Sequence, residues 1–239
     1  MCLCDKKKKY MPKNETINNY INELSLAFEN AANPQNAISQ KAYMKNNFEF
    51  FGIKTPERRE IQKPFLETEF LPKKEDSELI IRTLWDKTQR EFHYFAMELA
   101  CKYTKKIQEK DIELFEYLIL HNSWWDSIDV IAPKLVSAYF KKFPEKRYSR
   151  IENWLKSNNI WLKRSSILFQ LHNKKETDFE FLEYVINSLL GTNEFFIDKA
   201  IGWILREYGK TNPKKVIDFC ETTKLSNLSK KEALRRISD

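Results

Sequence analysis

The chain has 239 residues, of which 42% are hydrophobic and 14% are aromatic, including 17 Phe. This composition excludes a disordered chain and supplies enough apolar side chains for a substantial core. The 41 basic residues exceed the 34 acidic ones, and the resulting net charge of +7 favours an anionic partner. With only four glycines, the chain is also unsuited to an all-β fold or to a glycine-rich nucleotide loop.

The N-terminal stretch MCLCDKKKKYMPK is basic, but no apolar segment follows it, so it does not match a signal peptide. No run of 18 apolar residues occurs anywhere, which predicts no membrane segment. The four cysteines have neither zinc-site nor disulfide spacing, which indicates a reducing compartment and no metal. We therefore expect a cytoplasmic protein in which residues 1–14 form a disordered basic leader.

Helical periodicity dominates the rest of the chain, and strand patterns hardly occur. Pro133 is expected to kink a long central helix or to end its first segment near Ala132. The predicted helices lie near residues 16–31, 37–50, 56–66, 75–88, 90–103, 108–120, 124–142, 145–156, 159–171, 176–190, 194–209, 212–221 and 229–237.

These helices group into pairs when the second helix of each pair is aligned on the polar residue before it. The aligned residues are separated by 33, 36, 35 and 36 positions: Gln89, Asn122, Asn158, Asn193 and Ser229. Such a pitch is typical of stacked helical hairpins, and the Trp, Gly and Ala pattern of tetratricopeptide repeats is missing. We predict an all-α fold, a right-handed superhelical solenoid of HEAT-like repeats spanning residues 15–239 as one domain. Its second helices would line a concave face, and the less regular first 70 residues would form a helical cap.

The stretch SWWDSID at residues 123–129 combines two tryptophans with two carboxylates. Ser123 followed by Asp126 matches a capping box, which gives Asp126 a structural role. A core stripe follows at helical spacing, formed by Trp124, Ile128, Ile131 and Leu135. Trp125 and Asp129 fall on another face, four residues apart, so Asp129 is the carboxylate without a structural explanation.

Aligned in this way, three consecutive second helices present four residues to one surface: Trp125, Asp129, Arg164 and Trp203. The alignment can slip by one residue, because Asn159 serves as well as Asn158. Each residue also has a structural interpretation. Trp125 can be core, Asp129 can pair with Lys134 or another surface charge, and the Arg164 charge can be satisfied by a buried ion pair with Asp129.

A second stripe, of bases around a tryptophan, lies on the helix predicted near 194–209. Its members are spaced four, three and four residues apart: Lys199, Trp203, Arg206 and Lys210. Core helices seldom show this pattern. An aromatic ring flanked by lysine and arginine side chains suits nucleic acid, since these positive charges neutralise phosphate. The stripe therefore predicts a surface that binds nucleic acid.

At these residues the chain resembles the AlkD-like DNA glycosylases of alkylation repair. The resemblance rests on SWWDSID at 123–129, NIWLKRSSILFQL at 159–171 and EFFIDKAIGWILREYGKTNP at 194–213, and it extends more weakly to about residue 16. It implies a HEAT-like solenoid that cradles duplex DNA and hydrolyses the N-glycosidic bond of cationic N3- and N7-alkylated purines. By this resemblance Asp129 is the catalytic carboxylate, Trp125 and Trp203 are the aromatic pair at the damaged nucleotide, and Arg164 is a basic residue at the same site. Tyr43, in KAYMKN, is similar to a further site aromatic, and Arg206 to a phosphate-contacting residue.

The chemistry implied by the resemblance needs neither a metal nor a cofactor, because alkylation already makes the purine a good leaving group. The expected partner is duplex DNA containing alkylated purines such as 3-methyladenine and 7-methylguanine, bound by a monomer. Two alternatives use the same scaffold without catalysis: a DNA-binding protein and a protein-binding helical scaffold. The preferred base, and whether it is flipped out of the duplex, are left open.

Overall fold

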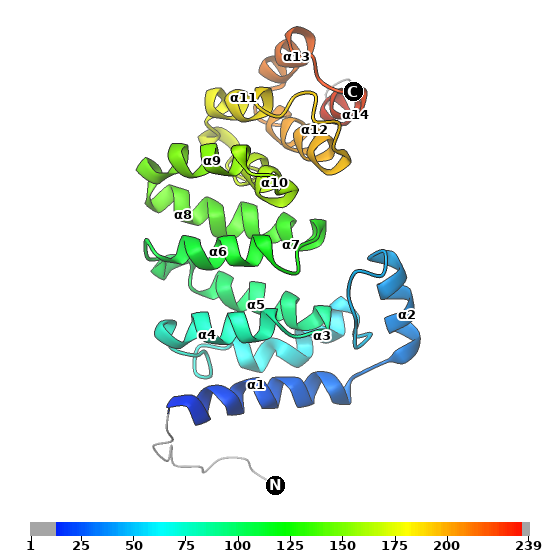
Figure 1. The fold of residues 1–239 in the computed structure, drawn as a ribbon, viewed down its shortest axis with the longest axis vertical. Coiled ribbons are helices and arrows are strands. Elements are labelled where there is room, and N and C mark those ends of the chain that lie inside the picture. The colour runs from blue at the N-terminus through cyan, green and yellow to red at the C-terminus, as the bar shows by residue number, and fades with distance from the viewer. Residues whose placement is uncertain (1–12, 236–239) are drawn as a thin grey trace. The chain divides into compact units, whose positions relative to one another are not determined.

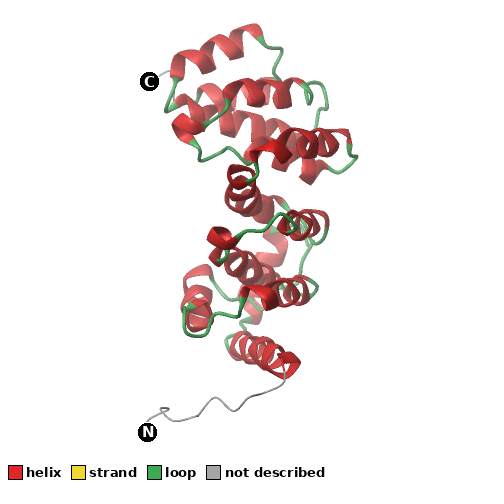
Figure 2. Ribbon diagram, turned by 90° about the vertical axis from the view of Figure 1, so that its left-hand side faces the viewer, coloured by secondary structure: helices red, strands yellow, loops and turns green. Residues whose placement is uncertain are grey.

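The computed structural model describes residues 13–235, and the chain divides into two compact units, Met1–Tyr103 and Thr104–Asp239. Between residues 13 and 235 the chain forms helices joined by loops and turns, with no strand (Figure 2). The predicted all-α class is therefore confirmed. The predicted leader falls almost wholly on residues 1–12, which lie outside the described residues, and the first described helix begins at Lys13 rather than near residue 16.

The first unit contains α1 (Lys13–Asn30), α2 (Pro34–Tyr43), α3 (Thr55–Gln62), the short 3-10 helix η1 (Lys63–Leu66), α4 (Lys74–Trp85) and α5 (Arg90–Lys102) (Figure 1). The prediction of a helix over 37–50 is wrong at both ends. Pro34 starts α2 earlier, after the Asn33 N-cap. Beyond Tyr43 the backbone turns left-handed at Lys45 and Asn46, with φ of 57° and 60°, which ends the helix.

The second unit continues the helical pairs. Its elements are η2 (Thr104–Lys106), α6 (Asp111–Leu120), α7 (Trp125–Val130), η3 (Ile131–Val136), α8 (Ser137–Lys142), η4 (Pro144–Lys146), α9 (Arg147–Lys156), α10 (Ile160–Leu168), η5 (Lys174–Glu176), α11 (Phe179–Asn187), α12 (Phe195–Gly209), α13 (Pro213–Thr222) and α14 (Asn227–Leu234). Its core is made of large apolar side chains with almost no exposure, such as Ile128, Leu135, Ile167 and Leu205.

The helices predicted as second members of their pairs pack against one another in succession. Both α7 and η3 contact α10, α10 contacts α12, and α12 contacts α14. Their observed N-caps are Gln89, Trp124, Asn159 and Glu194, each 35 residues after the last, followed by Ser226 for α14. The predicted repeat is thus present, but its alignment slips: Asn159, not Asn158, caps α10 by accepting the amides of Trp161 and Leu162.

Pro133 interrupts the central helix close to the predicted position, because the first α-helical segment, α7, ends at Val130. The helix runs from Trp125 to Lys142, but Ile131–Val136 is a π-helical turn, in which the Ser137 amide donates to the Ala132 carbonyl five residues back. Proline lacks the amide that an α-helix would bond to the Asp129 carbonyl. The wider turn lets the chain pass the proline immediately after Asp129, and such turns are frequent at functional sites.

The predicted capping box is also wrong. The N-cap of α7 is Trp124, whose amide and carbonyl both bond to the Ser127 hydroxyl, at 3.2 and 2.9 Å. The Ser123 hydroxyl turns back instead and donates to the Ile119 carbonyl at the end of α6. Asp126 lies in the first turn of α7, where a carboxylate is favoured by the helix dipole.

Candidate functional site

Asp129 and Arg164 form an ion pair between α7 and α10. Arg164 Nη2 lies 2.7 Å and Nε 3.1 Å from the same carboxylate oxygen, Oδ1 of Asp129. The arginine side chain is 5% exposed and the aspartate side chain 19% exposed. Each residue lies five positions after the N-cap of its helix, so the 35-residue repeat brings them together. Asp129 and Arg164 are thus brought together as the repeat predicted, and they form the buried ion pair that was the structural alternative for Arg164. The alternative pairing of Asp129 with Lys134 is wrong.

The second carboxylate oxygen of Asp129, Oδ2, accepts no hydrogen bond from the described residues. Burial raises the pKa of the Asp129 carboxyl above its ordinary value. The Arg164 charge and hydrogen bonds lower that pKa in part, while the neighbouring Asp126 charge raises it further. The pair therefore leaves one oriented carboxylate oxygen available, on a group that is harder to ionise than an exposed aspartate.

The third donor of Arg164 is also used. Its Nη1 donates to the backbone carbonyl of Phe196 in the first turn of α12. Arg164 thus joins three consecutive second helices, α7, α10 and α12, with one side chain. Because the Arg164 side chain is only 5% exposed and each of its three nitrogens already donates within the protein, the structure argues against a direct phosphate contact by Arg164.

An aromatic cluster surrounds this junction and was missed in the sequence. The rings of Trp124, Trp161 and Phe196 contact one another with centroids 5.1 to 5.5 Å apart. Each ring sits at the start of a second helix, so the repeat brings the three together as it does the ion pair. The aromatic residues two positions into α10 and α12 were the available signal. The cluster fixes the Phe196 backbone that holds Arg164.

Trp125 and Trp203 are both partly exposed, on α7 and α12, and both helices pack on α10. Trp125 is the first residue of α7, one turn before Asp129. The alternative that Trp125 is a fully buried core residue is wrong. Two partly exposed indole rings therefore lie on α7 and α12, the two second helices that contact α10, which carries Arg164.

The bases around Trp203 each have an acidic neighbour. Lys199 Nζ lies 2.7 Å from Oε2 of Glu232, and Arg206 pairs with Oε1 of the same carboxylate. Lys210 lies 2.6 Å from Glu207 on its own helix. Glu232 was not among the predicted site residues, since it is more than 25 residues away from both of its partners along the chain.

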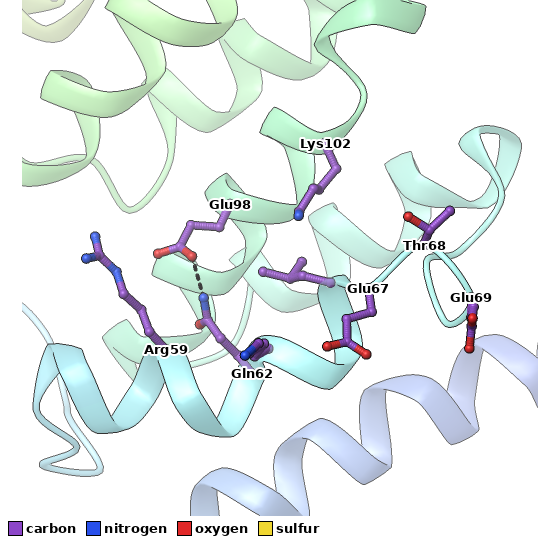
Figure 3. A pocket seen from close by; sticks show the side chains of 9 residues that line it. Arg59, Gln62, Glu67, Thr68, Glu69, Glu98 and Lys102 are labelled. Carbon is purple, nitrogen blue, oxygen red and sulfur yellow. Dashed lines mark hydrogen bonds between the residues drawn. The ribbon is translucent and has the colours of Figure 1, made fainter.

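Tyr43 ends α2 in the first unit, and it is 67% exposed. The same unit contains a cavity of about 590 Å³ (Figure 3). Its wall carries three bases, Arg59, Lys63 and Lys102, and three carboxylates, Glu67, Glu69 and Glu98. Glu98 is already bonded to Arg58 and Gln62. The charges in this cavity are balanced, and none of the predicted site residues lines it.

The described residues bear on the predictions for metal sites and membrane segments. Among residues 13–235, no group of three His, Cys, Asp or Glu side chains is placed to hold a metal ion. No helix in that range is long and apolar enough to cross a membrane.

Comparison with known proteins places the chain in a family. A family described as DNA alkylation repair enzyme matches residues 24–237, whereas no curated protein matches the chain. The solved structure of a predicted DNA alkylation repair enzyme from Enterococcus faecalis is 31% identical, covers 87% of this chain and 97% of its own, and has a TM-score of 0.80.

Two more distant structures share the fold. AlkD2 from Streptococcus mutans is 16% identical over 93% of this chain and 100% of its own, with a TM-score of 0.62. The protein smu.31 from Streptococcus mutans UA159 is 17% identical over 75% of this chain and 94% of its own, with a TM-score of 0.57. On the match over residues 24–237, this chain belongs to the DNA alkylation repair enzyme family.

Proposed function

We propose that the protein is a DNA glycosylase that hydrolyses the N-glycosidic bond of cationic N3- and N7-alkylated purines, such as 3-methyladenine and 7-methylguanine, in duplex DNA. The observation that carries this proposal is the partly exposed Asp129 carboxylate, whose Oδ1 is held by Arg164 and whose Oδ2 accepts no hydrogen bond from the described residues. Membership of an alkylation repair family supplies the substrate class.

The proposed reaction requires a carboxylate whose position is fixed and which has an oxygen available. A purine alkylated on a ring nitrogen is positively charged, so the bond from C1′ to the purine breaks with its electron pair going to the base. Positive charge then develops on the deoxyribose, and a fixed carboxylate nearby stabilises it. Oδ2 of Asp129 would also orient the attacking water, whose oxygen bonds to C1′ while its proton passes to the carboxylate.

The two tryptophans have a complementary role in this proposal. The faces of indole rings attract cations and exclude water, so Trp125 and Trp203 would favour a cationic nucleotide and strengthen the charge interaction with Asp129. Arg164 acts on the reaction through Asp129, because it fixes the position of Oδ1 and lowers the pKa of the carboxyl. The bases Lys199, Arg206 and Lys210 would contact phosphates, which position the duplex without reading its sequence. No step requires a metal or a cofactor.

The test is release of free base from a duplex oligonucleotide carrying a single 7-methylguanine, in the presence of a chelator, with binding to an undamaged duplex measured in parallel. We expect release of 7-methylguanine and salt-sensitive binding. Binding without release of this base or of 3-methyladenine would instead favour a noncatalytic DNA-binding protein. Absence of both would favour a protein-binding scaffold.

A further inference from the structure

Glu232, on α14, forms ion pairs with the two basic side chains that flank Trp203 on α12, Lys199 and Arg206. Lys199 pairs with its Oε2 and Arg206 with its Oε1, so each carboxylate oxygen holds one base. We propose that Glu232 is a positioning residue for DNA binding, which fixes Lys199 and Arg206 in the orientations that contact the phosphate backbone on either side of Trp203. The proposal rests on the proposed function, since it presumes that DNA is the partner.

The charges around Glu232 remain positive after pairing. A third base, Arg235, lies 3.8 Å from the same carboxylate, so three bases surround one acid. The carboxylate is only 11% exposed, whereas the Lys199 side chain is 38% exposed and the Arg206 side chain 18% exposed. The acid therefore lies beneath the bases, and the excess positive charge faces the solvent, where a phosphate can reach it.

The close approach of α14 to α12 places Glu232 between the two bases. Gly202 lies between Lys199 and Arg206, and a Cβ on Gly202 would come within 2.5 Å of the Glu232 Cβ. Glycine in a helix interior is less stable than alanine, so its presence at this point is explained by the contact that it permits. The Ser229 hydroxyl, fully buried, adds a 2.9 Å hydrogen bond to the Asp198 carbonyl of α12.

The arrangement resembles the Asp129–Arg164 pair, two repeats further along the unit. Lys199 lies five positions after the Glu194 N-cap, as Asp129 and Arg164 do after theirs, and Glu232 lies six positions after the Ser226 N-cap. In both places an acid on one second helix pairs with a basic side chain on an adjacent second helix, but the acid comes first along the chain in one pair and last in the other. Such an ion pair between second helices therefore occurs at both α7–α10 and α12–α14.

Positioning and plain electrostatics predict opposite results when Glu232 is changed. Glu232→Gln removes one negative charge close to the proposed DNA surface, and long-range attraction alone would then strengthen DNA binding. If Glu232 positions the bases, the same change releases them, and binding weakens although the net charge has become more positive. The sign of the change in affinity therefore decides between the two.

The experiment measures binding of the full chain to an undamaged duplex over a range of salt concentrations. For Glu232→Gln we expect about fivefold weaker binding and a salt slope smaller by about one, equivalent to one lost phosphate contact. Base release at saturating enzyme should be unchanged, while the half-saturating concentration rises. The matched control is Glu180→Gln, an exposed carboxylate on α11 with the same charge change, which should bind no more weakly than wild type.

Two further variants separate positioning from a general loss of folding. Glu232→Asp keeps the charge but shortens the side chain, and it should also weaken binding. In the background of Arg206→Gln together with Lys199→Gln, Glu232→Gln should cost almost nothing, because neither of the two basic side chains that Glu232 is proposed to position is left. A Glu232→Gln protein that binds DNA as well as or better than wild type would overturn the proposal, as would an undiminished cost in that background. Absence of DNA binding by the wild type itself would overturn the proposed function as well.

Discussion

Two ion-paired clusters in the second unit use the same repeat geometry but differ in charge and exposure. In the first cluster one acid, Asp129, pairs with one basic side chain, Arg164, and both are largely buried. Arg164 also donates a hydrogen bond to a backbone carbonyl. The Glu232 cluster has three bases around one acid and keeps its bases partly exposed. Balanced, desolvated charge suits a site where a transition state develops charge, whereas excess exposed charge suits binding of phosphate.

Similar positions in a helical repeat can thus be given separate tasks by changing their partners. The first cluster holds an acid whose second oxygen is not used by its base. The second holds bases that remain in excess over their acid. In the proposed enzyme, chemistry and backbone binding are thus divided between neighbouring helical layers, and each can be disturbed without the other.

Among the basic side chains of the two clusters, the largest effect on base release is expected for Arg164→Met, which removes the positive charge of the first cluster. Asp129 would lose the charge that lowers its pKa and the bonds that fix Oδ1, so base release near neutral pH should fall by about a hundredfold, comparable to loss of one transition-state stabilising group. The measurement is the rate of 7-methylguanine release against pH. The acid limb of that profile should lie at higher pH than in wild type, since removal of Arg164 leaves the burial of Asp129 uncompensated. An Arg164→Met profile that superimposes on wild type would contradict the assigned role.

A smaller effect is expected for Arg206→Gln in the second cluster. Loss of one phosphate contact should weaken duplex binding by roughly tenfold and reduce the salt slope by about one, with little change in base release at saturating enzyme. The control is Lys175→Gln, which removes the same charge from an exposed site in η5. Equal salt slopes for the two variants would remove the phosphate assignment of Arg206.

The smallest effect concerns the pH dependence of stability. The folded-state pKa of Asp129 is raised above its ordinary value, so its favourable contribution is present at low pH and is lost as pH rises through the raised pKa. Between the ordinary pKa of aspartate and the raised pKa of Asp129, the free energy of unfolding of wild type relative to Asp129→Asn should therefore decrease as the pH rises. Urea unfolding at a series of pH values measures the difference, and an increase with pH would show that the pKa is depressed instead.

Much of the helical framework could be predicted from the sequence. The predicted ranges located every described α-helix, because most of these helices bury one face and so carry a regular apolar pattern, whereas the short 3-10 helices η2 and η5 were missed. The end of α2 failed because a local backbone feature decides it, the left-handed conformation of Asn46. At Pro133 an interruption was predicted, but not its π-helical form. Neither conformation is encoded by apolar spacing.

The candidate site could be predicted only in part. The repeat placed Asp129 beside Arg164 because both occur at the same distance from an N-cap, even though the aligned residues were shifted. The partners Glu232 and the Phe196 carbonyl were missed. Glu232 lies on a short helix whose start was misplaced, and a backbone carbonyl leaves no mark in a sequence.

The most direct test of the central claim compares Asp129→Asn with Asp126→Asn, two neighbouring carboxylates on α7 changed in the same way. Single-turnover release of 7-methylguanine from duplex DNA should fall by about a hundredfold or more for Asp129→Asn, with duplex binding and the folded state retained. Asp126→Asn should release the base at close to the wild-type rate, with its acid limb at slightly lower pH because one charge that raises the pKa of Asp129 is gone. Wild-type release by Asp129→Asn, or equal losses in both variants, would contradict the assignment of the chemistry to Asp129.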